Sequence, residues 1–200
     1  MLRAILEGKN IMPVEMNSLS LPIAFVVVLA VLYGVAMKLA DLCNEHGLRW
    51  FRGDAAIFGL LWGLFGGLLV LVNPVVANGL LAQMLSYIIR RLLDYWNHAA
   101  AAMVIILTFL ATQQPFLPAP FAIFFLGFTV FGLQRDHYGR KKEPAFIYQL
   151  HETAWYYLLV PVLYWCYTGH WVALIVFPIY RAAYNAVKYG LYWNGNYKNF

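Results

Sequence analysis

The segment Tyr87–Met103, YIIRRLLDYWNHAAAAM, places acid–base side chains between two apolar runs. If one helix continues through it, Arg90, Asp94 and His98 share a face, because steps of four residues return to the same side of a helix. Asp94 is then expected to orient the His98 imidazole, to pair with Arg90, or to bind a metal together with His98. The alternative is a capped helix end whose arginines reach the membrane surface.

Three further segments place a carboxylate beside an imidazole, namely Glu45–His46, Asp136–His137 and His151–Glu152. Each has an alternative without chemistry, which is a polar loop, a basic rim that contacts lipid headgroups, or an aromatic belt at a membrane interface. Paired acids and imidazoles suit proton transfer and metal binding. We therefore treat all three segments as candidates.

Arg181 lies well inside the last apolar run, and Asn185 follows it four residues later. An arginine embedded in such a helix requires an anionic partner. This partner is expected to be a structural carboxylate such as Asp41 or Asp94, or a substrate phosphate or carboxylate, which a guanidinium binds with several donors.

These side chains define three predicted sets of roles. The catalytic set is Glu45, His46, Asp94, His98, His151 and Glu152. The substrate-binding set is Arg90, Arg91, Asn97, Arg181 and Asn185. The metal-binding set is Asp94, His98, Asp136 and His137, and the expected cofactor is a divalent cation, Mg²⁺ or Zn²⁺.

The elements that must position these residues are strongly apolar. Of the 200 residues, 62% are hydrophobic and only 12% are charged, against about 25% charged in ordinary globular chains. Apolar stretches of ~15–22 residues match the thickness of a bilayer core. The fold class is therefore predicted to be all-α, a polytopic integral membrane helical bundle. The net charge of +5 does not indicate nucleic acid as a partner, because the basic residues flank the apolar spans.

We expect seven spans, at about 21–41, 54–72, 74–93, 99–112, 121–134, 146–167 and 170–188. They form one transmembrane domain over 1–200, with an interfacial segment at 1–20, the bundle at 21–189 and a polar aromatic tail at 190–200. The first span is interpreted as a retained helix, since the residues before it lack the pattern of a cleaved signal.

The second span carries glycines at near-helical spacing, Gly59, Gly63, Gly66 and Gly67. Small residues on one face let a neighbouring helix approach closely. This glycine face is predicted to be a packing seam within the bundle, and it is also the candidate contact for a homo-oligomer.

Charged residues are concentrated on one predicted side of the bundle, which carries 12 of the 14 lysines and arginines and 7 of the 9 acids. All lysines and arginines except Arg3 and Lys9 lie on the side of the C-terminus, and NPVVAN, TQQPFLPAP and YTGH on the other side carry no charge. The positive-inside rule then places the N-terminus outside and the C-terminus in the cytoplasm of a multi-pass protein of the cell (inner) membrane. Acids contribute little to orientation, so their position on the same side needs another explanation.

Length supplies a second constraint. About 20 residues are needed to cross a bilayer, so the third and fourth spans both need the Arg90–His98 segment to complete their crossing. This reversal is therefore expected to be recessed toward the bilayer.

Together these patterns predict an enzyme that acts on a membrane lipid with a phosphate-bearing headgroup, by transfer or hydrolysis, in a polar cytoplasmic pocket. Two alternatives remain open. An ion- or proton-coupled small-molecule transporter would use the same acids and histidines as a relay, although transporter sites tend to lie at the bilayer midplane. If the chain is a non-catalytic membrane subunit, replacing Asp94 or His151 with alanine is expected to leave activity intact and to lower the abundance of the protein.

Overall fold

The computed structural model describes residues 19–140 and 155–193. Within these ranges the secondary structure consists of seven helices: α2 (Ile23–Glu45), α3 (Asp54–Val70), α4 (Pro74–Ile89), α5 (Trp96–Ala111), α6 (Pro118–Arg140), α8 (Trp155–Thr168) and α9 (Val172–Trp193). The predicted all-α class is confirmed, and each helix overlaps one predicted apolar span, although α6 is longer at both ends than the predicted span 121–134. The first part of the sixth predicted span lies outside the described residues.

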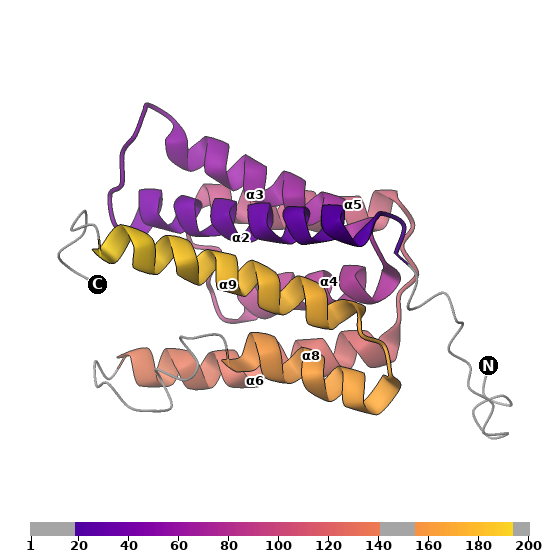
Figure 1. Ribbon diagram of the computed structural model, residues 1–200. Helices are drawn as coiled ribbons and strands as arrows, with labels where there is room; N and C mark the ends of the chain where they lie inside the picture. The colour runs from indigo at the N-terminus through magenta and orange to yellow at the C-terminus, as the bar shows by residue number, and fades with distance from the viewer. Residues whose placement is uncertain (1–18, 141–154, 194–200) are drawn as a thin grey trace, which may run out of the picture.

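Successive helices run in opposite directions, so the ends of α2, α4, α6 and α9 lie at one end of the bundle, on the left in Figure 1. The helices α5, α3, α2, α9, α8 and α6 pack in that order, each against the next. Helix α4 contacts α3, α5, α6 and α9, and most of its residues are buried. It is the central helix around which the others are arranged.

The start of α4 is fixed by its sequence. Asn73 caps the helix by accepting a hydrogen bond from the Val75 amide at 2.8 Å, and Pro74 occupies the first turn, where its missing N–H carries no cost. One turn later, buried Asn78 donates to the Pro115 carbonyl at 2.8 Å and accepts from the Leu117 amide at 2.9 Å. The polar groups of α4 at this end therefore tie it to the α5–α6 connection.

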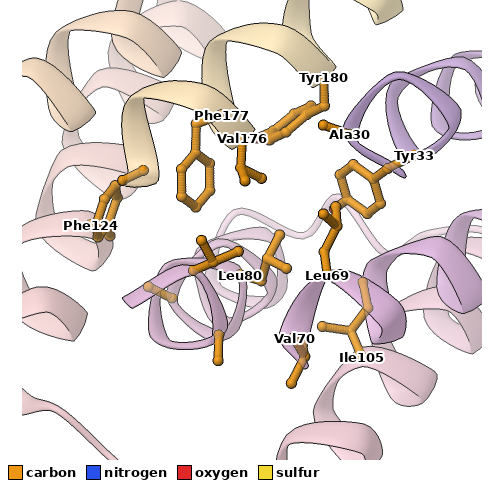
Figure 2. Packing of buried hydrophobic residues seen from close by; sticks show 14 of the residues in the cluster. Ala30, Tyr33, Leu69, Val70, Leu80, Ile105, Phe124, Val176, Phe177 and Tyr180 are labelled. Carbon is orange, nitrogen blue, oxygen red and sulfur yellow. The ribbon is translucent and has the colours of Figure 1, made fainter. Parts of the chain in front are cut away.

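Aromatic side chains fill the space around α4. Phe124 of α6 lies 4.9 Å from Phe177 of α9 between ring centroids, and Tyr33 of α2 lies 5.0 Å from Tyr180 of α9. Figure 2 shows Phe177 and Tyr180 above Leu80 of α4, with Phe124 on one side and Tyr33 on the other. These aromatic contacts join α2, α6 and α9 around α4.

The glycine face of α3 packs against α5, as predicted for a seam within the bundle. A Cβ atom on Gly59 would lie 2.6 Å from the Asn97 Cβ, and one on Gly63 would lie 3.0 Å from the Ala101 Cα. The homo-oligomer contact predicted for this face is not supported, because α5 of the same chain already covers it. Close helix approach therefore serves intramolecular packing here.

Replacing Gly34 with alanine is expected to destabilise the bundle by about 1–3 kcal/mol, the usual cost of overpacking. A Cβ atom there would collide with the Tyr180 carbonyl of α9, which is backbone and cannot rotate away. The matched control is Gly190→Ala, where the added Cβ meets nothing within 4 Å. The control is expected to be neutral or slightly stabilising, and equal melting temperatures for the two variants would contradict the proposed close contact.

The reversal between α4 and α5 differs from the prediction of helices that continue through it. Helix α4 stops at Ile89, and Arg91 adopts a left-handed φ of 57°. The Leu92 amide donates to the Tyr87 carbonyl at 2.9 Å, which closes the helix end. Arg90, Asp94 and His98 therefore do not form one continuous helical face.

Among the described helices, α2 is the one both long and apolar enough to cross a membrane, with 23 residues. Three shorter apolar helices, α3, α4 and α5, accompany it.

Candidate functional site

A polar cavity of about 110 Å³ lies near the end of the bundle where α2, α4, α6 and α9 end. Every described helix contributes to its wall, and so does the reversal between α4 and α5. Its lining residues are Met37, Asp41, Glu45, Trp62, Tyr87, Leu92, Asp94, His98, Arg135, Tyr157, Arg181 and Tyr184. The cavity therefore brings together Glu45, Asp94, His98 and Arg181, which come from three separate candidate segments of the sequence.

Helix α2 supplies the acidic wall. Met37, Asp41 and Glu45 follow one another at four-residue steps, so they form a single stripe on the helix. Asp41 accepts a short hydrogen bond of 2.6 Å from the Tyr184 hydroxyl, and that hydroxyl also accepts from the Lys38 amine at 3.4 Å. These contacts from α9 and α2 fix the Asp41 carboxylate at the cavity.

His98 lies between two carboxylates. Its Nε2 is 3.3 Å from Asp41 Oδ1, and its Nδ1 is 3.7 Å from Asp94 Oδ1. Nε2 makes no hydrogen bond to Asp41 although the two groups are close. The Asp41 carboxylate therefore acts on this nitrogen only through its charge. The prediction that Asp94 faces His98 agrees with this geometry, whereas Asp41 was expected only as an ion partner of Arg181.

The His98 ring is also held by aromatic neighbours. Trp62 of α3 and Tyr95 present edge contacts at centroid distances of 5.6 and 5.4 Å. The preceding residue, Asn97, donates its amide to the Ala55 carbonyl at 2.9 Å and accepts from Asn44. These contacts use Asn97 to tie α5 to α2 and α3, which is a structural role and differs from the predicted substrate contact.

The cationic wall comes from α9 and α6. Arg181 is only 3% exposed, and its guanidinium carbon lies 4.4 Å from the Tyr184 ring centroid and 5.2 Å from that of Tyr157. Such cation–π contacts help to hold a guanidinium in place. Arg135 of α6 lines the same cavity. Two arginines therefore line the same cavity as the acidic stripe and His98.

A pair of tyrosines forms the inner wall. The hydroxyls of Tyr87 on α4 and Tyr157 on α8 are hydrogen-bonded at 2.7 Å, and Gln83 donates to the Tyr87 hydroxyl at 2.7 Å. This chain of polar groups leads from the cavity toward the centre of the bundle.

Arg90 does not face this cavity. Its Nε and Nη2 donate to the two oxygens of Asp136 on α6, each at 2.9 Å. The guanidinium passes over Gly132, where any Cβ would collide with it. The predicted substrate role of Arg90 and the predicted metal role of Asp136 are therefore not supported, because the two side chains neutralise each other in a bidentate ion pair.

The remaining candidates lie around the cavity or away from it. His46 lies 3.8 Å from Glu45, and burial together with the nearby Lys38 lowers the pKa of its imidazole below the ordinary value. Arg91 and His137 are exposed, and Asn185 is partly buried. Residues His151 and Glu152 lie outside the described residues.

The predicted metal set is not assembled. Within residues 19–140 and 155–193, no group of three or more His, Cys, Asp or Glu side chains could hold an ion. The two carboxylates beside His98 face its opposite ring nitrogens, so they cannot share one ion with a single nitrogen. This geometry favours acid–base chemistry by the imidazole over its use as a metal ligand.

Several lining residues were not among the predicted site residues. They are Met37, Asp41, Trp62, Tyr87, Leu92, Arg135, Tyr157 and Tyr184. The four-residue step from Asp41 to Glu45 and the three-residue step from Arg181 to Tyr184 were the available signals, since each places the pair on one helix face. Tyr87 and Tyr157 carry no such signal, because buried tyrosines are common in apolar helices.

The chain matches no known family model, no curated protein and no solved structure. Function must therefore be argued from the cavity itself.

Proposed function

We propose that the chain is a polytopic membrane bundle of seven spans, with its N-terminus outside and its C-terminus in the cytoplasm. Exposed apolar side chains on the outer faces of the helices support this. They include Leu60 and Leu64 on α3, Leu107 and Leu110 on α5, Leu126 and Val130 on α6, and Leu158 and Leu163 on α8. A bundle in water would present polar residues there.

The short central helices fit the same proposal. Helix α4 has 16 residues, which is about 24 Å of helix against a hydrocarbon core of about 30 Å. The reversal after α4 would then lie within the membrane boundary, at the level of the polar cavity. Lipid headgroups could reach the cavity without leaving the interface.

Within this bundle we infer an enzyme that acts on a phosphate-bearing lipid headgroup by hydrolysis or transfer. The observation that carries the inference is the placement of His98 between Asp41 and Asp94, in the same cavity as Arg135 and Arg181. An imidazole beside carboxylates is suited to general acid–base catalysis. The guanidiniums, buried in Arg181 and partly buried in Arg135, are suited to a phosphate.

In the proposed reaction, His98 Nε2 takes the proton of a water or acceptor hydroxyl as that oxygen forms a new bond to phosphorus. The bond between phosphorus and the leaving oxygen breaks, and the imidazolium returns the proton to that oxygen. Arg135 and Arg181 neutralise the charge on the non-bridging phosphate oxygens. Asp94 faces the opposite ring nitrogen, Nδ1, and the negative charges of Asp94 and Asp41 stabilise the imidazolium.

The size of the cavity limits which part of a lipid it would hold. A volume of about 110 Å³ is below the ~300–1,000 Å³ of ordinary ligand pockets. This is enough for a phosphate group and an attacking oxygen, and not for an acyl chain. The lipid tails would remain in the bilayer.

The test uses the purified chain in nanodiscs that contain mixed phospholipids, with products identified by mass spectrometry. Wild-type protein is expected to generate a product with altered phosphate linkage, and Arg181→Gln is expected to lose most of this turnover. The matched control is Arg52→Gln, because Arg52 is exposed on the α2–α3 connection. Turnover by Arg181→Gln at the wild-type rate, with both variants folded, would refute the assignment, and so would the absence of any product.

A proton-coupled transporter is the second candidate, and the Gln83–Tyr87–Tyr157 chain is the observation that favours it. Hydrogen-bonded hydroxyls that lead inward from carboxylates and an imidazole are suited to a proton relay. Proton flux into proteoliposomes without chemical change of any lipid, reduced by Tyr87→Phe, would favour the transporter over the enzyme.

A further inference from the structure

A second hollow lies beside the cavity, on the outer surface of the reversal between α4 and α5. It is a groove of about 360 Å³ lined by Ile88, Arg91, Leu93 and Asp94. Asp94 also lines the polar cavity, and its side chain is 60% exposed. The groove and the cavity therefore meet at one carboxylate.

The groove combines the chemistry of an amphiphile. Ile88 and Leu93 provide apolar walls, Arg91 provides an exposed guanidinium, and Asp94 provides an exposed carboxylate. One positive and one negative side chain beside apolar walls match a zwitterionic phospholipid headgroup, which carries a phosphate and an amine next to its glycerol and acyl chains.

Arg91 is not the residue that its backbone position favours. Its φ of 57° is left-handed, a conformation that glycine adopts freely and that costs other residues about 1 kcal/mol. The helix-closing hydrogen bonds of this turn come from backbone amides, including Arg91 N to Ile88 O at 3.1 Å. The guanidinium is therefore not required to form the turn, and it is exposed at the groove.

We propose that this groove binds the headgroup of an aminophospholipid, with the phosphate at Arg91 and the amine at Asp94, and that it delivers the headgroup to the polar cavity. This inference rests on the proposed function for the delivery step, whereas the binding step can be tested by itself. It names a substrate class, a zwitterionic phospholipid that carries a primary amine.

The chain offers a matched pair of variants for the test. Gln113 at the end of α5 has the same left-handed conformation, with φ 50°, and the same pattern of closing bonds, Gln113 N to Leu110 O and Gln114 N to Phe109 O. It lies at the opposite end of the bundle. Arg91→Gly and Gln113→Gly should both relieve backbone strain and leave the melting temperature unchanged or higher.

The experiment titrates short-chain phosphatidylethanolamine or phosphatidylglycerol into the detergent-solubilised chain and measures bound lipid by native mass spectrometry. Wild-type protein and Gln113→Gly are expected to bind phosphatidylethanolamine more tightly than phosphatidylglycerol. Arg91→Gly is expected to weaken binding of both lipids by about fivefold, the usual contribution of one basic residue near a membrane surface. Asp94→Asn is expected to remove the preference for the amine.

Unchanged lipid binding by Arg91→Gly, or equal binding of the two lipids by the wild type, would overturn the proposal. Arg91→Gln, which keeps the side-chain length and removes the charge, gives the same readout if the glycine variant folds poorly. The two proposals fail separately. Normal turnover by a His98 variant with weakened lipid binding by Arg91→Gly would refute only the catalytic assignment, and the reverse result would refute only the groove.

Discussion

Replacement of His98 by glutamine is expected to reduce lipid turnover by about 10²–10⁴-fold, the usual contribution of a positioned general base. The glutamine amide keeps a polar group between Asp41 and Asp94 but cannot accept and return a proton. Turnover is measured in nanodiscs under the conditions used for the wild type, with the melting temperature measured in parallel. Because His98 is nearly fully buried, the fold of the variant must be confirmed before the rates are compared.

His170 provides the matched control for this variant. It is a second buried histidine, at the α8–α9 connection and so at the opposite end of the bundle from the cavity. Burial lowers the pKa of its imidazole below the ordinary value. His170→Gln is expected to retain wild-type turnover, and an equal loss in both variants would indicate a general effect on folding, which would contradict a catalytic role for His98.

The second large effect is expected at the Arg90–Asp136 pair. The Arg90 side chain has 0% exposure and Asp136 has 22%, so Asp136→Asn leaves a buried guanidinium without its counter-charge. Loss of one partner from a buried ion pair typically costs about 3–5 kcal/mol, and we expect an unfolding free energy lower by that amount. Reversible unfolding in mixed detergent micelles measures it.

A paired replacement separates charge burial from packing. Arg90→Met combined with Asp136→Leu removes both charges and keeps apolar volume, so the double variant is expected to recover most of the stability lost in Asp136→Asn.

Gly132→Ala tests the same contact from α6, since its Cβ would collide with the Arg90 guanidinium. If Asp136→Asn is as stable as the wild type, the pair does not hold the reversal to α6.

The helices could be located from the sequence because each apolar run is bounded by polar or helix-breaking residues. Pro74 and Pro118 mark the starts of α4 and α6, and Asp54 marks the start of α3. The glycine face of α3 was likewise predictable as a seam, because glycines at helical spacing leave a groove for a neighbouring helix. Which helix would fill that groove was not predictable, and it proved to be α5 of the same chain.

The partners of individual charged residues were less predictable. The spacing of Arg90, Asp94 and His98 indicated one face only on the assumption of a continuous helix, and α4 ends at Ile89. With the chain reversed after Arg90, its guanidinium meets Asp136 of α6, 46 residues away in sequence. Local spacing carries no information about such a contact.

The sequence by itself determined the all-helical class, the approximate limits of the seven described helices and the concentration of most charged groups on one side of the bundle. The helical class and the helix limits follow from transfer free energies, which depend on the composition of each segment separately. The side on which the charged groups lie follows from the alternating direction of successive helices. The tertiary structure decided which charged groups share the cavity, since this depends on the order of the helices around α4 and on the rotation of each helix about its axis. Both are fixed by side-chain packing between distant segments, such as Gly34 against Tyr180 and Gly59 against Asn97, and for this reason Asp41 and Arg135 joined His98 at the cavity while Arg90 did not.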